Sequence, residues 1–294
     1  MSRLASLVEV SKSKRKRLIV AAADDEVVLS AIKSAIEYEI VFPILVGPQE
    51  NIKSLSEEVG LDLSECEIID APKDRSAAKA VETASKNGDL LMKGSVKTSD
   101  LMKVVLQEEY GLRMGATITM VSVFDIPTYH KLLAISDAGM IIAPTFEQKV
   151  DMINISVKVM KRLGVEKPKV AVLGAVEVPN LKMPATIDAA VLSKMNDRGQ
   201  IKDCIIDGPF ALDNAISSEA AKHKGIQSSV AGDADILIMP DIEAGNIFYK
   251  AMVFLANAKV ASVILGAKLP IVLTSRADSD ETKLYSIALA ALLA

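Results

Sequence analysis

The chain has 294 residues, of which 50% are hydrophobic and 24% charged, and its formal net charge is −4. This composition predicts a globular protein that is large enough for two α/β domains. The negative charge argues against a nucleic-acid partner. No uninterrupted apolar stretch reaches the ~18 residues of a membrane span, and no apolar core with a cleavage site follows the N-terminus. We therefore expect a cytoplasmic protein that binds neither nucleic acid nor membrane.

The mean hydropathy of +0.29 is high for such a protein. We attribute the excess to buried parallel strands and to an apolar subunit interface, so we expect a homo-oligomer, a dimer or higher. The two cysteines, Cys66 and Cys204, each lie in an apolar, strand-like context without a CxxC partner or a neighbouring histidine. We expect two buried thiols in a reducing cytoplasm rather than a disulfide, a metal site or a nucleophile.

Apolar runs and helical patterns alternate along the chain. Strands are predicted at residues 17–23, 40–46, 66–70, 89–92, 116–123, 132–135, 169–173, 203–206, 235–240 and 269–274. Helices are predicted at residues 25–37, 76–87 and 99–110, and a long amphipathic helix from residue 145. Such alternation is typical of largely parallel sheets that are covered by helices on both faces, so the fold class is α/β.

The sequence Ala143-Pro144-Thr145 interrupts the pattern before the long helix and divides the chain into halves of similar size. We predict a first α/β lobe of residues 1–143, completed by about residues 280–294. The second α/β lobe then comprises residues 144–279, and a cleft lies between the two.

Two groups of basic residues have structural explanations. The run KSKRKR at residues 12–17 is either a phosphate-contacting patch or the solvated entrance to the strand that follows it. Its position directly before an apolar run favours the strand entrance. His130 and His223 are isolated on polar segments, so we expect them at the surface.

The turn MKGSVKT at residues 92–98 follows a predicted strand. In open α/β folds ligands bind outside the carboxyl ends of strands, so Lys93 and Gly94 lie where a site is expected. A glycine, two hydroxyls and two lysines can hold an anion at the start of the next helix. An ordinary strand–helix turn explains the same residues, and both interpretations stay open.

A second polar cluster, DIEAGN, begins at Asp241 after another apolar run. Gly245 permits a close backbone approach, and Asn246 can both donate and accept hydrogen bonds. Tyr249 follows within one helical turn, where its hydroxyl can bind a phosphoryl oxygen. The alternatives are a cap on a helix that begins near Ile247 and a half-buried core aromatic.

The sharpest signal is the pair Ser275-Arg276 after the last apolar run. An arginine at the end of a buried strand needs an anionic partner, because an unpaired cation there is costly. That partner is either an acid of the following segment, namely Asp278, Asp280 or Glu281, or a bound anion such as phosphate. Asp278 with Glu281 also matches a capping box, and an acid used as a cap is less available as a base.

Five ordered segments together resemble a known family. They are LMKGSVKT, LGAVEVPNLKMPATIDAA, IIDGPFALDNAIS, ADILIMPDIEAGNIFYK and PIVLTSRADSDETKLYSIALA. They look like the phosphate acetyl/butyryltransferases, in register from about residue 17 to the C-terminus. SRAD stands where the acetyl branch tends to read SRGC, so the phosphate butyryltransferase branch is favoured. The resemblance implies two α/β lobes like those of isocitrate and isopropylmalate dehydrogenases.

The reaction that the resemblance implies is reversible transfer of a short-chain acyl group, butyryl favoured, between acyl-CoA and inorganic phosphate. Arg276 would hold the phosphoryl group, and Ser275 would bond the thiol or thioester end. The family's substrate-binding positions are matched by Lys93, Gly94, Asp241, Gly245, Asn246 and Tyr249. Acetyl-transferring members place a proposed catalytic aspartate seven residues after the serine, where this chain has Thr282. The adjacent acid, Glu281, is then the candidate base.

Direct transfer in a ternary complex needs no metal, no cofactor and no covalent enzyme intermediate, since CoA and phosphate are substrates. When acyl-CoA is formed, a base must take the thiol proton, because a free thiol has a pKa of about 8.5. The alternatives are a phosphate acetyltransferase, a catalytically silent protein that binds CoA or acyl phosphate, and a nicotinamide-dependent decarboxylating dehydrogenase. The dehydrogenase is disfavoured because no set of three aspartates is placed to ligate a divalent metal.

Overall fold

The computed structural model describes residues 2–12, 15–275 and 278–294. Its internal contacts divide the chain into two compact units. Unit 1 comprises Met1–Ala116 and Val260–Ala294, and unit 2 comprises Thr117–Lys259. Pro144, at the predicted lobe boundary, lies inside unit 2. There it precedes Thr145, which forms a capping box with Gln148 at the start of α6 (Phe146–Arg162).

In the described part of unit 1, the strands run in the order β3-β2-β1-β4-β11-β10. They are β1 (Lys16–Ala21), β2 (Val41–Gly47), β3 (Glu67–Asp70), β4 (Leu90–Lys93), β10 (Lys259–Leu265) and β11 (Ile271–Val272). β10 and β11 are antiparallel, and the other neighbours are parallel. In the central strands β1, β4 and β11, the apolar runs at residues 18–21, 90–92 and 271–272 are fully buried, as parallel strands covered on both faces are.

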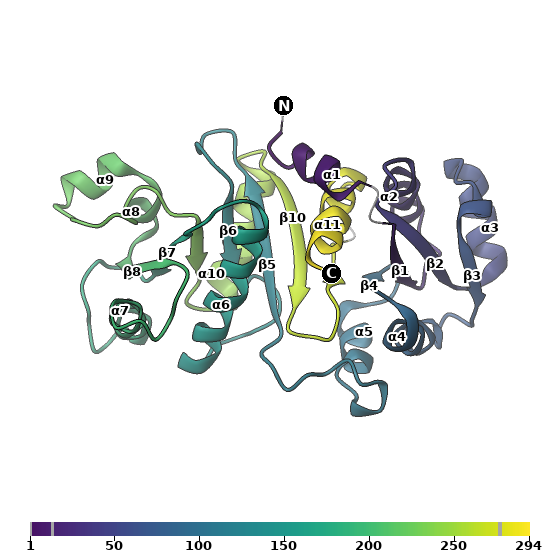
Figure 1. Ribbon diagram of the computed structural model, residues 1–294, viewed down its shortest axis with the longest axis horizontal. Helices are drawn as coiled ribbons and strands as arrows, with labels where there is room; N and C mark the ends of the chain where they lie inside the picture. Colours follow the sequence, from purple (N-terminus) through teal and green to yellow (C-terminus); the bar gives the residue numbers. More distant parts are fainter. Residues whose placement is uncertain (1, 13–14, 276–277) are drawn as a thin grey trace. The chain divides into compact units, whose positions relative to one another are not determined.

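Helices cover both faces of this sheet. One group contains α1 (Ala5–Ser11), α2 (Glu26–Glu37), α3 (Gln49–Val59) and α11 (Asp280–Leu293), in which α2 contacts α3 and α11, and α1 packs on α11 (Figure 1). The other group contains α4 (Ser76–Asn87) and α5 (Thr98–Val105). Because right-handed connections lead outward from β1 to β3 and then back to β4, the two groups lie on opposite faces. Short 3₁₀ helices span Leu63–Glu65 and Glu108–Tyr110.

Unit 2 has the strand order β5-β6-β9-β7-β8 in its described residues. Its strands are β5 (Thr119–Asp125), β6 (Leu133–Ser136), β7 (Lys169–Leu173), β8 (Ile205–Phe210) and β9 (Ile236–Ile238). β5 is antiparallel to β6, and the remaining neighbours are parallel. The carboxyl ends of β6, β9 and β7 therefore meet at one edge of the sheet, and their amino ends meet at the opposite edge.

The helices of unit 2 pack on these strands. α6 contacts β5, β6 and β9, whereas α7 (Pro184–Asp197) and α8 (Leu212–Ile216) contact β7 and β8. α9 (Ser218–His223) contacts α8, and α10 (Ile242–Phe254) follows β9. Over the described residues of both units, none of the helices combines the length and apolarity that crossing a membrane requires.

The predicted α/β class, with largely parallel pairing, is confirmed. Sequence analysis missed β10 and α1 and placed the start of α10 too late. The helix begins at Ile242 rather than near Ile247, because Asp241 caps it five residues earlier. β10 was missed because it lies close to β11 in one apolar stretch of the sequence. Only the part of that stretch at residues 269–274 was predicted as a strand.

Candidate active site

The carboxyl edge of unit 1 collects the ends of three neighbouring parallel strands, β1, β4 and β11. Beyond these ends the chain continues through Asp24, Gly94 and Ser275 respectively. Ligand sites of α/β folds form at such edges. The fold thus brings the MKGS turn and Ser275, which are far apart in the sequence, to the same edge of one sheet.

Gly94 closes the turn after β4 against the end of β1. Its N–H donates to the carbonyl of Ala21 (2.8 Å), and a Cβ at this position would lie 2.0 Å from the carbonyl oxygen of Ala22. A side chain there would force the two strand ends apart, so the backbone contact itself requires glycine. Ser95 completes the join, because its hydroxyl donates to the Asp24 carboxylate (2.7 Å).

Lys93 is buried in this turn, with 5% of its surface exposed. Its ammonium group donates to the carbonyls of Gly94 (3.1 Å) and Val96 (3.4 Å). The side chain is therefore folded back under its own turn at the carboxyl end of β4. Its role in substrate binding stays a prediction.

Ser275 is exposed, but its backbone is bonded on both sides. Its N–H donates to the Asp278 carboxylate (2.7 Å), and its carbonyl accepts from the N–H of Asp278 (3.2 Å). Lys283 of α11 donates to the carbonyls of both Ser275 (3.3 Å) and Asp278 (2.6 Å). Ser275 and Asp278 are thus bonded to each other and to α11, and Ser275 is exposed at the edge. Arg276 lies outside the described residues, so its phosphoryl-binding role stays a prediction.

The first turn of α11 differs from the capping box predicted for Asp278 and Glu281. Ser279 is the cap, because its hydroxyl accepts from the N–H of Thr282 (3.2 Å). Asp278 precedes the helix and uses its carboxylate on the N–H of Ser275 instead. A serine one residue further along reaches the free N–H groups of the helix, so the aspartate is not needed there.

The two acids that open α11 point in different directions, as helical geometry predicts. Asp280 accepts from the hydroxyl of Ser30 on α2 (3.4 Å). Glu281 accepts from the hydroxyl of Tyr285 one turn later (3.0 Å), and both line a cavity of about 680 Å³ that α1 also lines. Of the two, Glu281 alone faces this cavity.

At the carboxyl edge of unit 2, the DIEAGN segment fastens α10 to the end of β6. Asp241 caps α10 by accepting a backbone N–H of its first turn (2.8 Å). A Cβ on Gly245 would lie 2.0 Å from the carbonyl oxygen of Asp137, and Asn246 donates to the carbonyl of Ala138 (3.1 Å). The close approach that Gly245 permits is therefore to this backbone.

Tyr249 lies half-buried on α10 against the β5 strand. Its ring meets Phe124 edge to face, with ring centroids 5.5 Å apart. The ring thus packs with a core aromatic, whereas a ligand role for its hydroxyl stays a prediction. Its position on the same helix as Asn246 places both residues beyond the carboxyl end of β9.

Asp137 anchors this edge, and sequence analysis did not single it out. The side chain is 2% exposed and accepts from the hydroxyl of Thr119 (2.8 Å) and the N–H groups of Met120 (2.8 Å), Gly139 (2.7 Å) and Met140 (2.9 Å). This carboxylate shapes the turn on which α10 rests. The signal was an acid within two residues of the end of a predicted strand, a pattern close to the one that drew attention to DIEAGN.

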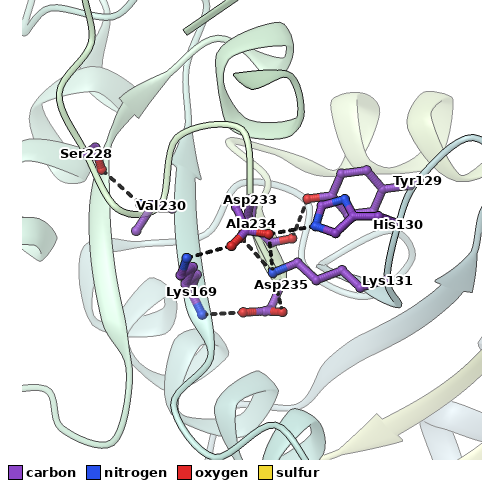
Figure 2. A network of polar contacts seen from close by, with 9 residues as sticks. All are labelled: Tyr129, His130, Lys131, Lys169, Ser228, Val230, Asp233, Ala234 and Asp235. Carbon is purple, nitrogen blue, oxygen red and sulfur yellow. Dashed lines mark hydrogen bonds and ion pairs between the residues drawn. The ribbon is translucent and has the colours of Figure 1, made fainter. Parts of the chain in front are cut away.

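A charged network occupies the opposite, amino edge of unit 2 (Figure 2). Asp233 lies within hydrogen-bond distance of Lys169 (2.6 Å), Lys131 (2.9 Å) and the ring of His130 (2.7 Å), and Lys131 also pairs with Asp235 (2.8 Å). Burial raises the pKa of Asp233, but hydrogen bonds from these three partners outweigh it and hold the pKa well below its ordinary value. The network ties together the starts of β6, β7 and β9.

Neither cysteine has the surroundings of a nucleophile. Cys66 is half-buried in unit 1, and Cys204 is buried in unit 2. Burial, supported by neighbouring acids, raises the pKa of each thiol to about 11, so both stay protonated at neutral pH. Within residues 2–12, 15–275 and 278–294, no group of three or more His, Cys, Asp or Glu side chains has the arrangement of a metal site.

Comparison with known proteins decides the family. A family model described as phosphate acetyl/butaryl transferase matches residues 2–87 and 73–291. The chain belongs to the phosphate acetyl/butyryltransferase family. The resemblance inferred from the motifs is therefore confirmed, and the chain is a member of a family of phosphate acyltransferases.

Individual relatives cover nearly the whole chain. Phosphate acetyltransferase of Thermotoga maritima is 59% identical over 99% of this chain and 99% of its own. Phosphate butyryltransferase of Clostridium acetobutylicum is 47% identical over 98% of this chain and 96% of its own. Among solved structures, a branched-chain phosphotransacylase from Enterococcus faecalis V583 matches with a TM-score of 0.81 at 29% identity, over 94% of this chain and 97% of that one. Family members named for two different acyl groups thus match along the full length.

Proposed function

We propose that this protein catalyses the reversible transfer of a short-chain acyl group between acyl-CoA and inorganic phosphate, giving acyl phosphate and CoA. The observation that carries the proposal is end-to-end identity of 59% and 47% to members named as phosphate acetyltransferase and phosphate butyryltransferase. The geometry supports it, because the buried Lys93 ends β4 and the exposed Ser275 follows the neighbouring β11 at one carboxyl edge.

We assign the steps to residues as follows. Arg276 holds the phosphoryl group with a two-pronged guanidinium contact, and the Ser275 hydroxyl bonds the sulfur end of CoA or of the thioester. Transfer is direct within a ternary complex: the thiolate attacks the acyl carbon of the acyl phosphate, and the bond from that carbon to the phosphate oxygen breaks. In the other direction, phosphate oxygen attacks the thioester and the thiolate leaves. No cofactor and no metal takes part.

Glu281 is the proposed base that removes the CoA thiol proton. It stands one residue before Thr282, the position at which acetyl-transferring members carry their proposed aspartate. Its carboxylate accepts from the Tyr285 hydroxyl and lines a cavity with residues of α1, and the lining of that cavity does not include Ser275, Lys93 or Gly94. Asp278 and Asp280 are engaged with Ser275 and Ser30, so the choice of Glu281 rests on its sequence position and on these two pairings.

Acetyl and butyryl are the competing acyl groups. The SRAD motif favours butyryl, whereas the 59% identity to a named acetyltransferase favours acetyl. One methylene in an apolar pocket is worth ~1–3 kcal/mol, so the ratio of kcat/KM for the two substrates separates them clearly. We propose butyryl as the preferred group on the strength of the motif.

The deciding experiment measures CoA release from acetyl-CoA, propionyl-CoA, butyryl-CoA and valeryl-CoA with and without phosphate. Phosphate-dependent release, unchanged by EDTA, is the expected result. Release that is abolished by EDTA and restored by a divalent ion would contradict the metal-free mechanism. Binding of CoA without turnover of any acyl-CoA would instead support a catalytically silent binding protein.

We also propose that the protein acts as a cytoplasmic homo-oligomer. Unit 2 exposes large apolar side chains that water disfavours, of which Leu181 is 89%, Leu255 86%, Ile247 69% and Phe254 65% exposed. Light scattering after size exclusion should give a mass of at least twice 31.4 kDa. A monomeric mass at micromolar concentration would contradict this proposal.

A further inference from the structure

Lys283 is a buried lysine beside the proposed active-site serine. It lies in the first turns of α11 with 3% of its surface exposed. Its ammonium group donates to the carbonyl oxygens of Asp278 (2.6 Å) and Ser275 (3.3 Å). These two carbonyls belong to the segment that joins β11 to α11.

A lysine is an expensive choice for this position if packing alone matters. Burying an ammonium group costs free energy unless hydrogen bonds replace its lost water, and an apolar side chain would avoid that cost. Burial lowers the pKa of Lys283, and the charges of Asp278, Asp25 and Asp280 oppose that shift. Hydrogen bonds to the backbone carbonyls of Ser275 and Asp278 therefore offset the free-energy cost of burying the ammonium group.

The contacts around the loop are reciprocal. Asp278 accepts the N–H of Ser275 through its carboxylate and donates its own N–H to the carbonyl of Ser275. The Lys283 ammonium group donates to the carbonyls of both residues. The backbone of Ser275 is therefore fixed at its N–H and at its C=O. The exposed side chain is left at the carboxyl edge on a fixed support. A support of this kind matters because small displacements of a reacting group lower the rate steeply.

We propose that Lys283 is a positioning residue for acyl transfer, which holds the backbone of Ser275 so that its hydroxyl meets the sulfur of CoA. The proposal rests on the proposed function. It assigns no contact between Lys283 and substrate, since the side chain acts through the loop.

Lys149 on α6 provides a matched control. It is 5% exposed, and its ammonium group pairs with the Asp188 carboxylate at 2.6 Å. It lies in unit 2 and has no assigned part in the reaction. Replacing either lysine by methionine removes a buried ammonium group while keeping most of the side-chain volume.

The test compares wild type, Lys283→Met, Lys283→Arg and Lys149→Met by melting temperature and by kcat and KM for acyl-CoA and phosphate. Both methionine variants should melt at lower temperature. Lys283→Met should lose ~10-fold or more in kcat with KM for acyl-CoA within about 2-fold, because an effect on positioning appears in the chemical step. Lys283→Arg should recover part of kcat, and Lys149→Met should keep the wild-type value.

A kcat of Lys283→Met near that of the wild type, with only the melting temperature lowered, would overturn the proposal. If Lys283→Met fails to fold by circular dichroism, Lys283→Gln takes its place, because its neutral amide nitrogen ends one bond short of the ammonium position and should hold the two carbonyls less well. A kcat of Lys283→Gln near that of the wild type would then overturn the proposal equally. An inactive wild type contradicts the proposed function itself, whereas an active wild type with normal kcat in the Met or Gln variant contradicts only the positioning role.

Discussion

The carboxyl edge of unit 1 and the amino edge of unit 2 both gather lysines, but they pair them differently. At the amino edge of unit 2, Lys131 and Lys169 meet the carboxylates of Asp233 and Asp235, as Figure 2 shows. At the carboxyl edge of unit 1, the hydrogen bonds of Lys283 go to backbone carbonyls.

This difference separates a structural use of charge from a functional one. Carboxylates neutralise the lysines at the amino edge of unit 2, and the resulting network joins three strand starts. Among the described residues, the Lys283 ammonium group donates to backbone carbonyls and to no carboxylate, so it fixes the backbone of Ser275 at the edge where an anionic substrate is proposed to bind. Lysines thus stabilise the amino edge of unit 2, whereas at the carboxyl edge of unit 1 Lys283 is proposed to position Ser275.

The largest effect is expected at the carboxyl edge, for Glu281→Gln. The amide cannot accept the thiol proton, so kcat should fall by roughly 10²-fold or more with little change in KM. Steady-state kinetics in the direction of acyl-CoA formation measures this. Asp280→Asn is the matched control, because Asp280 faces Ser30 on α2 instead of the cavity, and its kcat should stay normal. A near-normal kcat in Glu281→Gln would contradict the role of Glu281 as the base and would mean that the CoA thiol ionises without it.

Arg276→Lys should raise the KM for phosphate and acyl phosphate by about 10-fold, since a point charge does not reproduce a two-pronged guanidinium contact. The melting temperature should barely move if the arginine serves the ligand. Arg15→Lys, at an exposed pair with Glu65, is the control and should change neither quantity. A large loss of stability without a change in KM would instead support an ion pair between Arg276 and the acids of α11.

At the amino edge of unit 2, Asp233→Asn should lower the melting temperature at pH 7 by about 2–4 °C and leave kcat unchanged. The folded-state pKa of Asp233 is depressed, so its contribution to stability is fully present above the ordinary aspartate pKa of about 4. That contribution is lost as the pH falls below this value toward the folded-state pKa, so the difference between wild type and variant should shrink there. The side chain is 39% exposed, and solvent screening keeps the effect modest.

Thermal melts from pH 2 to pH 8 measure the contribution of Asp233. Asp197→Asn is the control, because Asp197 forms an exposed pair with Lys194 on α7, and its melting temperature should stay near that of the wild type at every pH. A constant difference between Asp233→Asn and wild type across the acidic range would show that the network does not act through the charge of Asp233.

The smallest effect is expected away from both edges, at the cysteines. The double variant Cys66→Ala, Cys204→Ala should keep most of its activity, because both thiols are protonated at neutral pH. Mass spectrometry during turnover should show no acyl group on the protein. An acyl group trapped on either sulfur would replace direct transfer by a covalent mechanism and make a cysteine part of the active site.

The predicted elements show where pattern reading succeeds. Buried parallel strands such as β1, β2 and β7 are continuous apolar runs bounded by polar residues, so periodicity finds them. The first residues of α10 and α11 were harder to predict, because both Asp241 and Asp278 are suitable N-caps by sequence. Asp241 does cap its helix, whereas Ser279 displaces Asp278, whose carboxylate binds the N–H of Ser275. That choice depends on loop geometry that no local pattern contains.

By itself, the sequence determined the α/β class, the order of most strands and helices, and the family, because buried strands, turns and ordered motifs are local properties of the chain. Tertiary structure alone decided which charged side chains meet. His130 has no acidic neighbour in the sequence, yet it lies 2.7 Å from Asp233. Lys283 follows the Ser275-Arg276 pair as one more helical residue, yet it is buried and donates to the carbonyl of Ser275. Side chains far apart in the sequence become partners only when the sheet aligns the strand ends, and burial then sets how strongly their charges interact.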